Sequence, residues 1–263
     1  MDLKNIKGFV LDMDGTIYLG DRLINGAKEF IDLLREQNKK FLFMTNNSSK
    51  SAMEYKIKLN RLGIEVEEKD IFTSGEATCI YIDNNSTKKN VYLLGTEELE
   101  QEFIRYGFNI VNNRSIAPDF VVLGFDTDLN YKKLWKACDY IREGMPFIAT
   151  HPDINCPLEG GKFMPDCGAM IEMIKASTGV EPKIIGKPNQ EIIEGIFQKT
   201  GLTKEELCIV GDRLYTDIAT GINSEVNTVL VLSGETKQGD LDKSPIGPDL
   251  VVNSIADIYN TIK

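Results

Sequence analysis

The sequence predicts an α/β fold in which the two ends of the chain form one parallel sheet and a second α/β domain is inserted between them. Short apolar runs, typical of buried strands, alternate with segments of helical apolar spacing along the 263 residues. Such alternation implies parallel strands joined by right-handed crossovers. The pattern changes near residue 80 and resumes after residue 180. We therefore expect a core domain of residues 1–79 and 181–263, interrupted by a domain of residues 80–180.

The elements of the first core segment follow from apolar spacing. The short apolar runs predict buried strands, and apolar residues at Ala27, Phe30, Ile31 and Leu34 predict one face of a helix. A second helix ends before Gly63, the usual place for a terminating glycine. The predicted strands are 9–11, 41–44 and 71–75, and the predicted helices are 27–37 and 51–62.

The insert and the last core segment continue the alternation. In the insert we expect strands at 91–94, 120–124 and 147–150 and helices at 97–106 and 131–143. In the last segment we expect a helix opened by residues 186–189, with its proline in the first turn. A capping box at 203–206 precedes a buried strand at 207–210. A strand at 228–232 and a helix from residue 254 complete the chain.

Composition narrows the function classes. A net charge of −10 argues against a nucleic-acid partner, whose binding needs a positive surface. No apolar run approaches the ~20 residues that span a bilayer, and the N-terminus lacks the apolar core of a signal peptide. The five cysteines form no C-x-x-C pair, so neither a disulfide framework nor a zinc site is indicated. We therefore expect a cytoplasmic protein without a membrane partner.

Two carboxylates follow the first strand directly. Asp12 and Asp14 project the same way from an extended chain, and both lose hydration at the end of a buried strand. In an open α/β sheet this end of a strand is where ligands bind. The pair is costly unless a cation compensates it. The alternative is an Asp-Gly turn, which needs only one of the two aspartates.

Polar side chains also stand at the ends of other predicted elements. Thr45 and Asn46 follow the second strand, Asp212 follows the strand at 207–210, and Asp217 comes five residues later. Lys187 stands at the start of a predicted helix. Taken singly, Thr45 and Asn46 can be helix caps, Asp217 an acid of a first helical turn, and Lys187 a solvated surface lysine. If the strands are neighbours in one parallel sheet, all of these side chains lie along its carboxyl edge.

This combination suits phosphoryl transfer. Carboxylate oxygens are the ligands that Mg²⁺ prefers, with water and substrate phosphate completing its coordination. A lysine, a hydroxyl and an amide can hold phosphate oxygens. One aspartate can attack phosphorus, and a second can protonate the leaving group and then activate water. His151 is the single histidine, which argues against histidine-based acid–base chemistry.

Four segments, in chain order, carry a family resemblance. They are Asp-Met-Asp-Gly-Thr at 12–16, Thr-Asn-Asn at 45–47, Gly-Lys-Pro at 186–188 and Gly-Asp-x-x-x-x-Asp at 211–217. Together they resemble the four ordered motifs of the haloacid dehalogenase-like (HAD) superfamily. Thr-Asn-Asn-Ser-Ser, Phe-Ile-Ala-Thr-His-Pro-Asp and Gly-Asp-Arg-Leu-Tyr-Thr-Asp-Ile resemble its NagD-like, p-nitrophenylphosphatase branch. The resemblance implies a doubly wound parallel Rossmann-like core sheet, with residues 80–180 as a C2-type α/β cap domain.

The resemblance also implies a role for each matching residue. Asp12 is then the nucleophile and a metal ligand, and Asp14 is the general acid/base and gives the metal its backbone carbonyl. The phosphoryl group is bound by Thr45 and Asn46, and Lys187 balances its charge against Asp12. Mg²⁺ is the implied cofactor. Asp212 ligates it directly and Asp217 does so through water.

Two other reactions known in the superfamily, dehalogenation and phosphomutase chemistry, fit this chain less well than phosphate ester hydrolysis. The dehalogenases lack an aspartate at the position of Asp14. Phosphomutases carry a cap between the first strand and the first core helix, where only twelve residues, 15–26, separate Asp14 from the helix. The resemblance therefore implies a Mg²⁺-dependent phosphatase of a small phosphorylated metabolite, with p-nitrophenyl phosphate as an artificial substrate. A phosphotransferase using the same intermediate and a non-catalytic phosphometabolite-binding module remain as alternatives.

Substrate choice is expected to reside in the cap. Asp153 and Asn155 are candidate substrate contacts, with a Pro-Asp turn as the equal alternative. Some relatives have an asparagine where this chain has His151, so the role of His151 is open. Caps of this kind can pair, so a homo-oligomer also stays open.

Overall fold

The computed structural model describes residues 1–112 and 114–263 and divides the chain into two compact units. The core unit contains residues 1–45, 52–72 and 187–263, and the inserted unit contains residues 46–51 and 73–186. The division into domains at 79/80 and 180/181 stays a prediction. Within the described residues no helix combines the length and the apolar character that crossing a bilayer requires.

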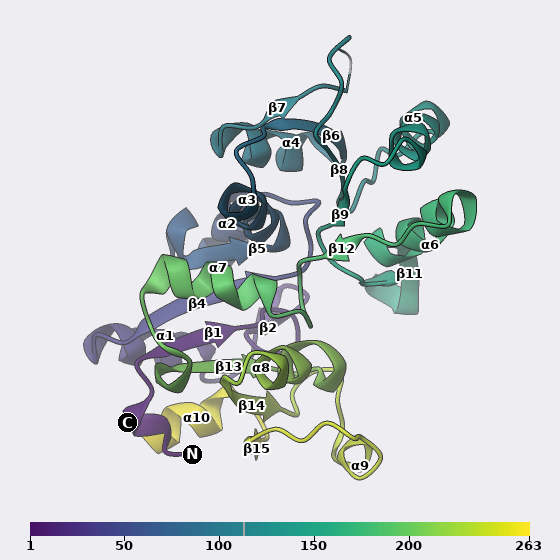
Figure 1. The fold of residues 1–263 in the computed structure, drawn as a ribbon. Helices are drawn as coiled ribbons and strands as arrows, with labels where there is room; N and C mark the ends of the chain where they lie inside the picture. Colours follow the sequence, from purple (N-terminus) through teal and green to yellow (C-terminus); the bar gives the residue numbers. More distant parts are fainter. Residues whose placement is uncertain (113) are drawn as a thin grey trace. The chain divides into compact units, whose positions relative to one another are not determined.

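The core unit is built on a six-stranded sheet with the order β15-β14-β13-β1-β4-β5. β1 pairs in parallel with both β4 and β13, and β14 pairs in parallel with β13 and β15. In Figure 1 the purple N-terminal strand β1 accordingly lies beside the green strand β13. The sheet strands are β1 (Gly8–Leu11), β4 (Lys40–Thr45), β5 (Ile71–Thr73), β13 (Leu207–Gly211), β14 (Asn227–Val231) and β15 (Leu250–Val252).

Alternate strand residues point to opposite faces of this sheet, so each face carries its own apolar cluster. Phe30 of α1 and Ile258 of α10 belong to one apolar cluster with Phe9 and Val210 of the sheet. Leu230, next to Val229 and Val231 of that cluster, packs instead with Leu214 and Ile218. The remaining elements of the unit are the hairpin β2 (Tyr18–Leu19) and β3 (Arg22–Leu23) and the helices α1 (Ala27–Glu36), α2 (Ala52–Leu62), α7 (Glu191–Thr200), α8 (Ala219–Asn223), α9 (Gln238–Leu241) and α10 (Ile255–Ile262).

The inserted unit has its own five-stranded sheet with the order β12-β9-β8-β6-β7, and all its pairings are parallel. Its helices α5 and α6 pack on one face through an apolar cluster that includes Tyr92 and Leu123. The elements are α3 (Ser74–Asn85), β6 (Asn90–Leu94), α4 (Glu97–Arg105), β7 (Asn109–Ile110), β8 (Phe120–Leu123), α5 (Tyr131–Arg142), β9 (Phe147–Ala149), the hairpin β10 (Asn155–Leu158) and β11 (Lys162–Pro165), α6 (Cys167–Thr178) and β12 (Lys183–Ile184).

The α/β class expected from the sequence is confirmed, and two local boundaries differ. The third strand ends at Thr73 rather than residue 75, because the Thr73 hydroxyl accepts a hydrogen bond from Glu76 N and starts α3. The helix expected at Lys187 begins only at Glu191. A residue before a proline avoids the helical region, so Lys187 stays in a turn ahead of α7.

Candidate active site

Two aspartates follow the carboxyl ends of two adjacent strands of the core sheet. Asp12 follows β1 and Asp212 follows β13, and the register pairs Leu11 with Val210. Taken in chain order, the six strands have the 3-2-1-4-5-6 order of doubly wound sheets, and β1 and β13 flank the point where that order reverses. The strand ends therefore place both carboxylates at the position where such sheets bind ligands.

A third aspartate completes a carboxylate cluster. Asp217 lies in a π-helical turn, Leu214–Ile218, and is fully buried. Gly211 makes room for it, because a Cβ at Gly211 would lie 2.3 Å from Cβ of Asp217. Asp12, Asp212 and Asp217 each present one oxygen atom such that the three atoms lie within 4.8 Å of one another.

Lys187 bridges two members of this cluster. Its Nζ donates to Oδ1 of Asp12 at 2.6 Å and to Oδ1 of Asp217 at 2.7 Å. Burial lowers the pKa of Lys187, but the two carboxylates outweigh burial and hold it above its ordinary value. The lysine is therefore a fixed positive charge at the cluster, contrary to the solvated surface lysine that was the alternative from sequence.

Burial governs the electrostatics of the carboxylates. It raises the pKa of Asp12 from 3.8 to about 8, against the opposing effect of Lys187 and with a further rise from Asp217. It raises the pKa of Asp212 to about 6, with Asp217 adding to the shift. One lysine thus leaves the negative charge of the cluster partly uncompensated, and a further cation there would favour the ionised carboxylates.

The donor atoms fit a hard divalent cation. Oδ2 of Asp212 accepts from Glu235 N at 2.6 Å, whereas its Oδ1 is buried and has no hydrogen-bond partner among the described residues. A buried carboxylate oxygen without a donor is costly, and an ion would satisfy it. The three carboxylates are therefore able to hold a metal ion.

Two other predicted site residues of the core unit lie at the same sheet edge. Asp14 is exposed and stands in the turn after β1, where Gly15 N donates to Tyr18 O at 2.8 Å. Gly15 has a φ of +85°, which glycine adopts without strain. Thr45 is the last residue of β4, the other neighbour of β1, and is half-buried.

Sequence reasoning missed the backbone that encloses Asp212. A Cβ at Gly234 would lie 1.9 Å from Oδ2 of Asp212, and a Cβ at Gly15 would lie 2.4 Å from the same atom. Ser233 Oγ donates to the Gly15 carbonyl at 2.7 Å and joins the two turns. The available signal was the Ser-Gly pair after the strand at 228–232, which ends on the same sheet edge as Asp212.

The remaining predicted site residues belong to the inserted unit. Asn46 is buried, and its Nδ2 donates to Oδ1 and Oδ2 of Asp153 at 3.2 and 3.3 Å. Asn155 is exposed and begins β10, opposite Pro165 of the hairpin. Asn46 and Asp153, 107 positions apart, are thus brought together, whereas the backbone of Asn155 is used in strand pairing.

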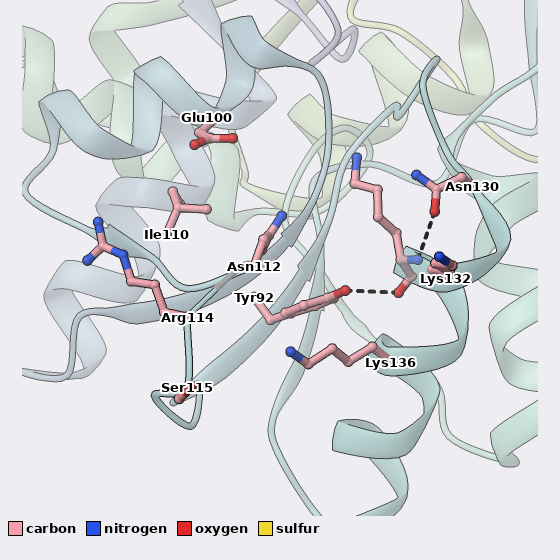
Figure 2. A pocket seen from close by; sticks show the side chains of 10 residues that line it. Tyr92, Glu100, Ile110, Asn112, Arg114, Ser115, Asn130, Lys132 and Lys136 are labelled. Atoms are coloured by element: carbon pink, nitrogen blue, oxygen red, sulfur yellow. Dashed lines mark hydrogen bonds between the residues drawn. The ribbon is translucent and has the colours of Figure 1, made fainter.

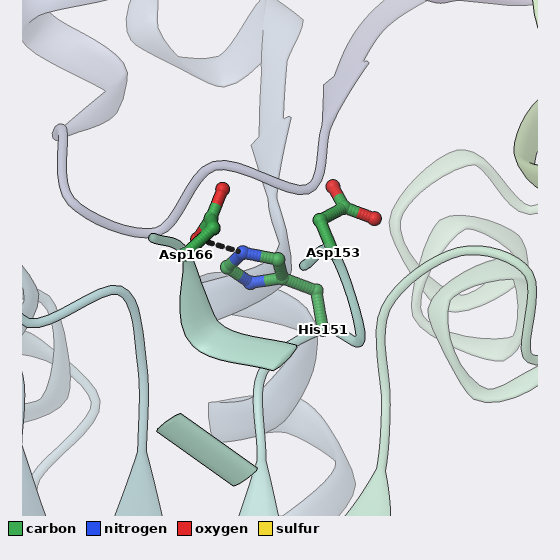
Figure 3. A group of neighbouring side chains, drawn as sticks. All are labelled: His151, Asp153 and Asp166. Atoms are coloured by element: carbon green, nitrogen blue, oxygen red, sulfur yellow. Dashed lines mark hydrogen bonds and ion pairs between the residues drawn. The ribbon is translucent and has the colours of Figure 1, made fainter. Parts of the chain in front are cut away.

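His151 is buried, and each of its ring nitrogens has a hydrogen-bond partner, of which Figure 3 shows Asp166. Its Nε2 lies 2.9 Å from Oδ1 of Asp166, and its Nδ1 lies 2.9 Å from Oγ1 of Thr150. Because a carboxylate only accepts, Nε2 carries a proton. Asp153 completes a group in which one potential ligand atom from each residue lies within 4.8 Å of the others. Both ring nitrogens already have partners, so we regard this group as structural.

The hydrogen bonds of His151 continue on both sides to backbone N–H groups. On one side Asp166 Oδ1 also accepts from Cys167 N at 2.6 Å, at the start of α6. On the other side Thr150 Oγ1 lies 3.0 Å from Ser48 Oγ, which accepts from Phe125 N at 2.9 Å. The sequence did not reveal these contacts, because Asp166 lies 15 positions from His151 and Ser48 lies 102 positions from Thr150.

Comparison with known proteins agrees with this arrangement. The model of the haloacid dehalogenase-like hydrolases matches residues 9–109, and a HAD-hydrolase-like model matches residues 184–258. The chain therefore belongs to the haloacid dehalogenase-like hydrolase family. Its similarities within the family lie with the NagD and p-nitrophenylphosphatase branch, as expected from the motifs.

Individual relatives are similar over the whole chain. An acid sugar phosphatase of Staphylococcus saprophyticus is 34% identical over 261 residues, which cover 99% of this chain and 100% of the relative. The crystal structure of a 4-nitrophenylphosphatase from Thermotoga maritima has a TM-score of 0.94 and 44% identity, with 100% of both chains covered. NagD from Escherichia coli K-12 has a TM-score of 0.89 and 31% identity, covering 96% of this chain and 98% of its own.

Proposed function

We propose that the protein is a Mg²⁺-dependent phosphatase that hydrolyses a small phosphomonoester through an aspartyl-phosphate on Asp12. The supporting observation is the carboxylate cluster with Lys187. Within it, the Asp12 side chain is 15% exposed, whereas Asp217 is 0% exposed and Asp212 is 2% exposed. Asp12 is therefore the carboxylate that a substrate can reach, and the buried pair is suited to hold the ion.

Four residues would hold the metal ion. We assign carboxylate oxygens of Asp12 and Asp212, the backbone carbonyl of Asp14, and Asp217 through water. A bound Mg²⁺ supplies a positive charge that stabilises the phosphoryl oxygens as charge develops on them. The exposed carboxyl group of Asp14 is then left for proton transfer.

The chain's own groups then carry out two displacements at phosphorus. In the first, an Asp12 oxygen bonds to phosphorus, the bond to the leaving oxygen breaks, and Asp14 gives that oxygen its proton. In the second, Asp14 takes a proton from water, the water oxygen bonds to phosphorus, and the bond to Asp12 breaks. Inorganic phosphate leaves, and both aspartates return to their starting states.

The substrate must be held in line for these steps. We assign the phosphoryl oxygens to the hydroxyl of Thr45, the amide of Asn46 and the ammonium group of Lys187, which also offsets repulsion between phosphate and Asp12. Residues 1–79 and 181–263 would form the catalytic domain, and residues 80–180 the C2-type cap. Asp153 and Asn155 are our candidate contacts to the rest of the substrate. The acid sugar phosphatase relatives support a sugar phosphate as its class.

The test compares Asp12→Asn with wild type in Mg²⁺-dependent hydrolysis of p-nitrophenyl phosphate. Asp32→Asn, at an acid of α1 whose side chain is 41% exposed, is the matched control. We expect wild type and the control to be active and Asp12→Asn to be inactive, with unchanged far-UV circular dichroism. Mg²⁺-dependent turnover by Asp12→Asn would exclude the mechanism. Phosphate transfer to added glycerol or ribose in preference to water would identify a phosphotransferase instead.

A further inference from the structure

The inserted unit contains a cavity of about 910 Å³ that none of the candidate active-site residues line. Figure 2 shows Arg114 and Ser115 on one side, Tyr92 in the middle, and Lys132 and Lys136 on the other side. A volume of this size is typical of small-molecule sites, which measure roughly 300–1,000 Å³. All of its lining residues belong to the inserted unit.

The cavity lies beside the point where the strand order of the inserted sheet reverses. The chain passes from β6 to the edge strand β7 through α4, and then returns past β6 to β8, which leads through α5 to β9. Right-handed crossovers in opposite directions place α4 and α5 on opposite faces of the sheet. Glu100 of α4 and Lys133 of α5 both line the cavity. Crevices at such a reversal are preferred ligand sites in open parallel sheets.

Positive charge is concentrated in this cavity. The whole chain has 40 acidic and 30 basic residues, yet four basic side chains and one acidic side chain line the cavity. Lys133 is already paired, since its Nζ lies 2.7 Å from Oδ2 of Asp126. Neither Arg114 nor Lys132 has an ion-pair partner within residues 1–112 and 114–263. These charges repel one another and attract an anion.

The fourth cation is held over aromatic rings. Lys136 Nζ lies 5.7 Å from the ring centroid of Tyr92 and 5.6 Å from that of Tyr140. The Tyr92 hydroxyl donates to the Lys133 carbonyl at 3.2 Å, so the ring is fixed against α5. The cavity therefore combines a positive lining with a rigid aromatic wall, and it is much larger than a phosphate ion.

We propose that this cavity binds a small phosphorylated metabolite as a second ligand, separate from the substrate hydrolysed at Asp12. The planar guanidinium of Arg114 and the ammonium groups of Lys132 and Lys136 suit phosphate oxygens. Tyr92, which is 2% exposed, would form only part of the floor beneath the organic part of the ligand. Glu100 would accept a hydrogen bond from a hydroxyl or ammonium group of that part.

The single tryptophan of the chain provides a local reporter. Trp135 lies on α5 beside Lys136 and is 60% exposed. We would titrate the protein with ribose 5-phosphate, ribose and citrate in EDTA, which keeps the metal-dependent hydrolysis switched off. We expect ribose 5-phosphate to change Trp135 emission with a Kd below ~1 mM, and ribose to have no effect. Added salt should weaken the binding.

Two matched double variants test the site. Arg114→Ser/Lys132→Gln removes two cations of the cavity, and we expect affinity to fall about tenfold. Arg142→Ser/Lys175→Gln removes two cations of the same unit outside the cavity and should bind as wild type does. Lys136→Gln is a second cavity variant, to be used if the first one loses its fold.

Each remaining outcome overturns the proposal. Unchanged affinity in the cavity variants would show that any response comes from another site. An equal response to ribose, a response to citrate alone, or no response of wild type up to ~10 mM ribose 5-phosphate would exclude phosphate recognition. Because these titrations need no turnover, they stand independently of the activity of Asp12→Asn.

Discussion

The ammonium group of Lys187 lies 2.6 Å from Oδ1 of Asp12, although the two residues are 175 positions apart in the sequence. The same ammonium group binds Asp217, so one cation serves two carboxylates of the cluster. This geometry couples the stability of the core unit to its charge balance.

Replacing Lys187 by methionine should destabilise the metal-free protein by about 3 kcal/mol or more, because it leaves buried carboxylates without their partner. Urea unfolding in EDTA measures the change. Lys204→Met, which removes an exposed pair with Glu225, should leave the free energy of unfolding nearly unchanged. Equal effects of the two substitutions would show that the Lys187 pairs are not what stabilises the unit.

The stabilising effect of Mg²⁺ should increase with pH. Burial raises the pKa of Asp12 to about 8 and that of Asp212 to about 6, so the folded metal-free protein binds protons that the unfolded chain releases. This contribution to stability is complete below the ordinary carboxyl pKa and is lost as the pH rises through about 6 to 8. Mg²⁺ competes with the same protons.

Thermal unfolding with and without Mg²⁺, at several pH values, tests this coupling. The increase in Tm on adding Mg²⁺ should be larger near pH 8 than near pH 5 if ionised Asp12 and Asp212 hold the ion. In Asp212→Asn the pH dependence should flatten. A Mg²⁺ effect that is larger at low pH would contradict the assigned ligands.

Gly234→Ala should weaken Mg²⁺ activation about tenfold or more, because its Cβ would lie 1.9 Å from Oδ2 of Asp212 and displace the carboxylate. The concentration of Mg²⁺ that gives half-maximal turnover is the quantity to measure. Gly239→Ala is the matched control, since a Cβ there meets no atom within 4 Å and Gly239 lies in α9. The same Mg²⁺ requirement in both variants would show that Asp212 does not need the close approach of Gly234.

Asp166→Ala should lower the free energy of unfolding by about 2 to 3 kcal/mol, because it removes a helix cap and leaves a buried nitrogen of His151 unpaired. Asn130→Ala removes only a cap, the bond from Lys133 N at the start of α5, and should cost about 1 kcal/mol. Urea unfolding compares the two. If Asp166→Ala lowers the free energy of unfolding no more than Asn130→Ala does, the hydrogen bond between Asp166 and His151 contributes nothing to stability.

Much of the framework was predictable because it depends on local pattern. The helices expected at 27–37 and 131–143 are α1 and α5 with shifts of one residue at their ends. The positions of Asp12 and Asp212 followed from the rule that ligands bind at the carboxyl ends of parallel strands. The helices follow from apolar spacing alone, and the shared edge of the two aspartates follows once their strands are placed in one parallel sheet.

The rest depended on contacts between distant residues. Gly234 lies close against the carboxylate of Asp212, and His151 is hydrogen-bonded to Asp166. No local sequence pattern marks either pair. The hairpin β10–β11 was not predicted because its side chains are mostly exposed and lack strand alternation. The sequence predicts too early a start for α7, because Pro188 fits the usual first-turn proline of a helix, whereas the helix begins at Glu191.

The position of β1 between β4 and β13 has a consequence for synthesis of the protein. β1 can pair with β4 soon after both have left the ribosome, but its other neighbour begins only at Leu207. Until then Asp12 stands at an open edge of a nascent sheet, without Asp212 or Asp217 beside it. A translating ribosome therefore carries a chain whose reactive centre is assembled only after β13 and the turn that follows it have been synthesised.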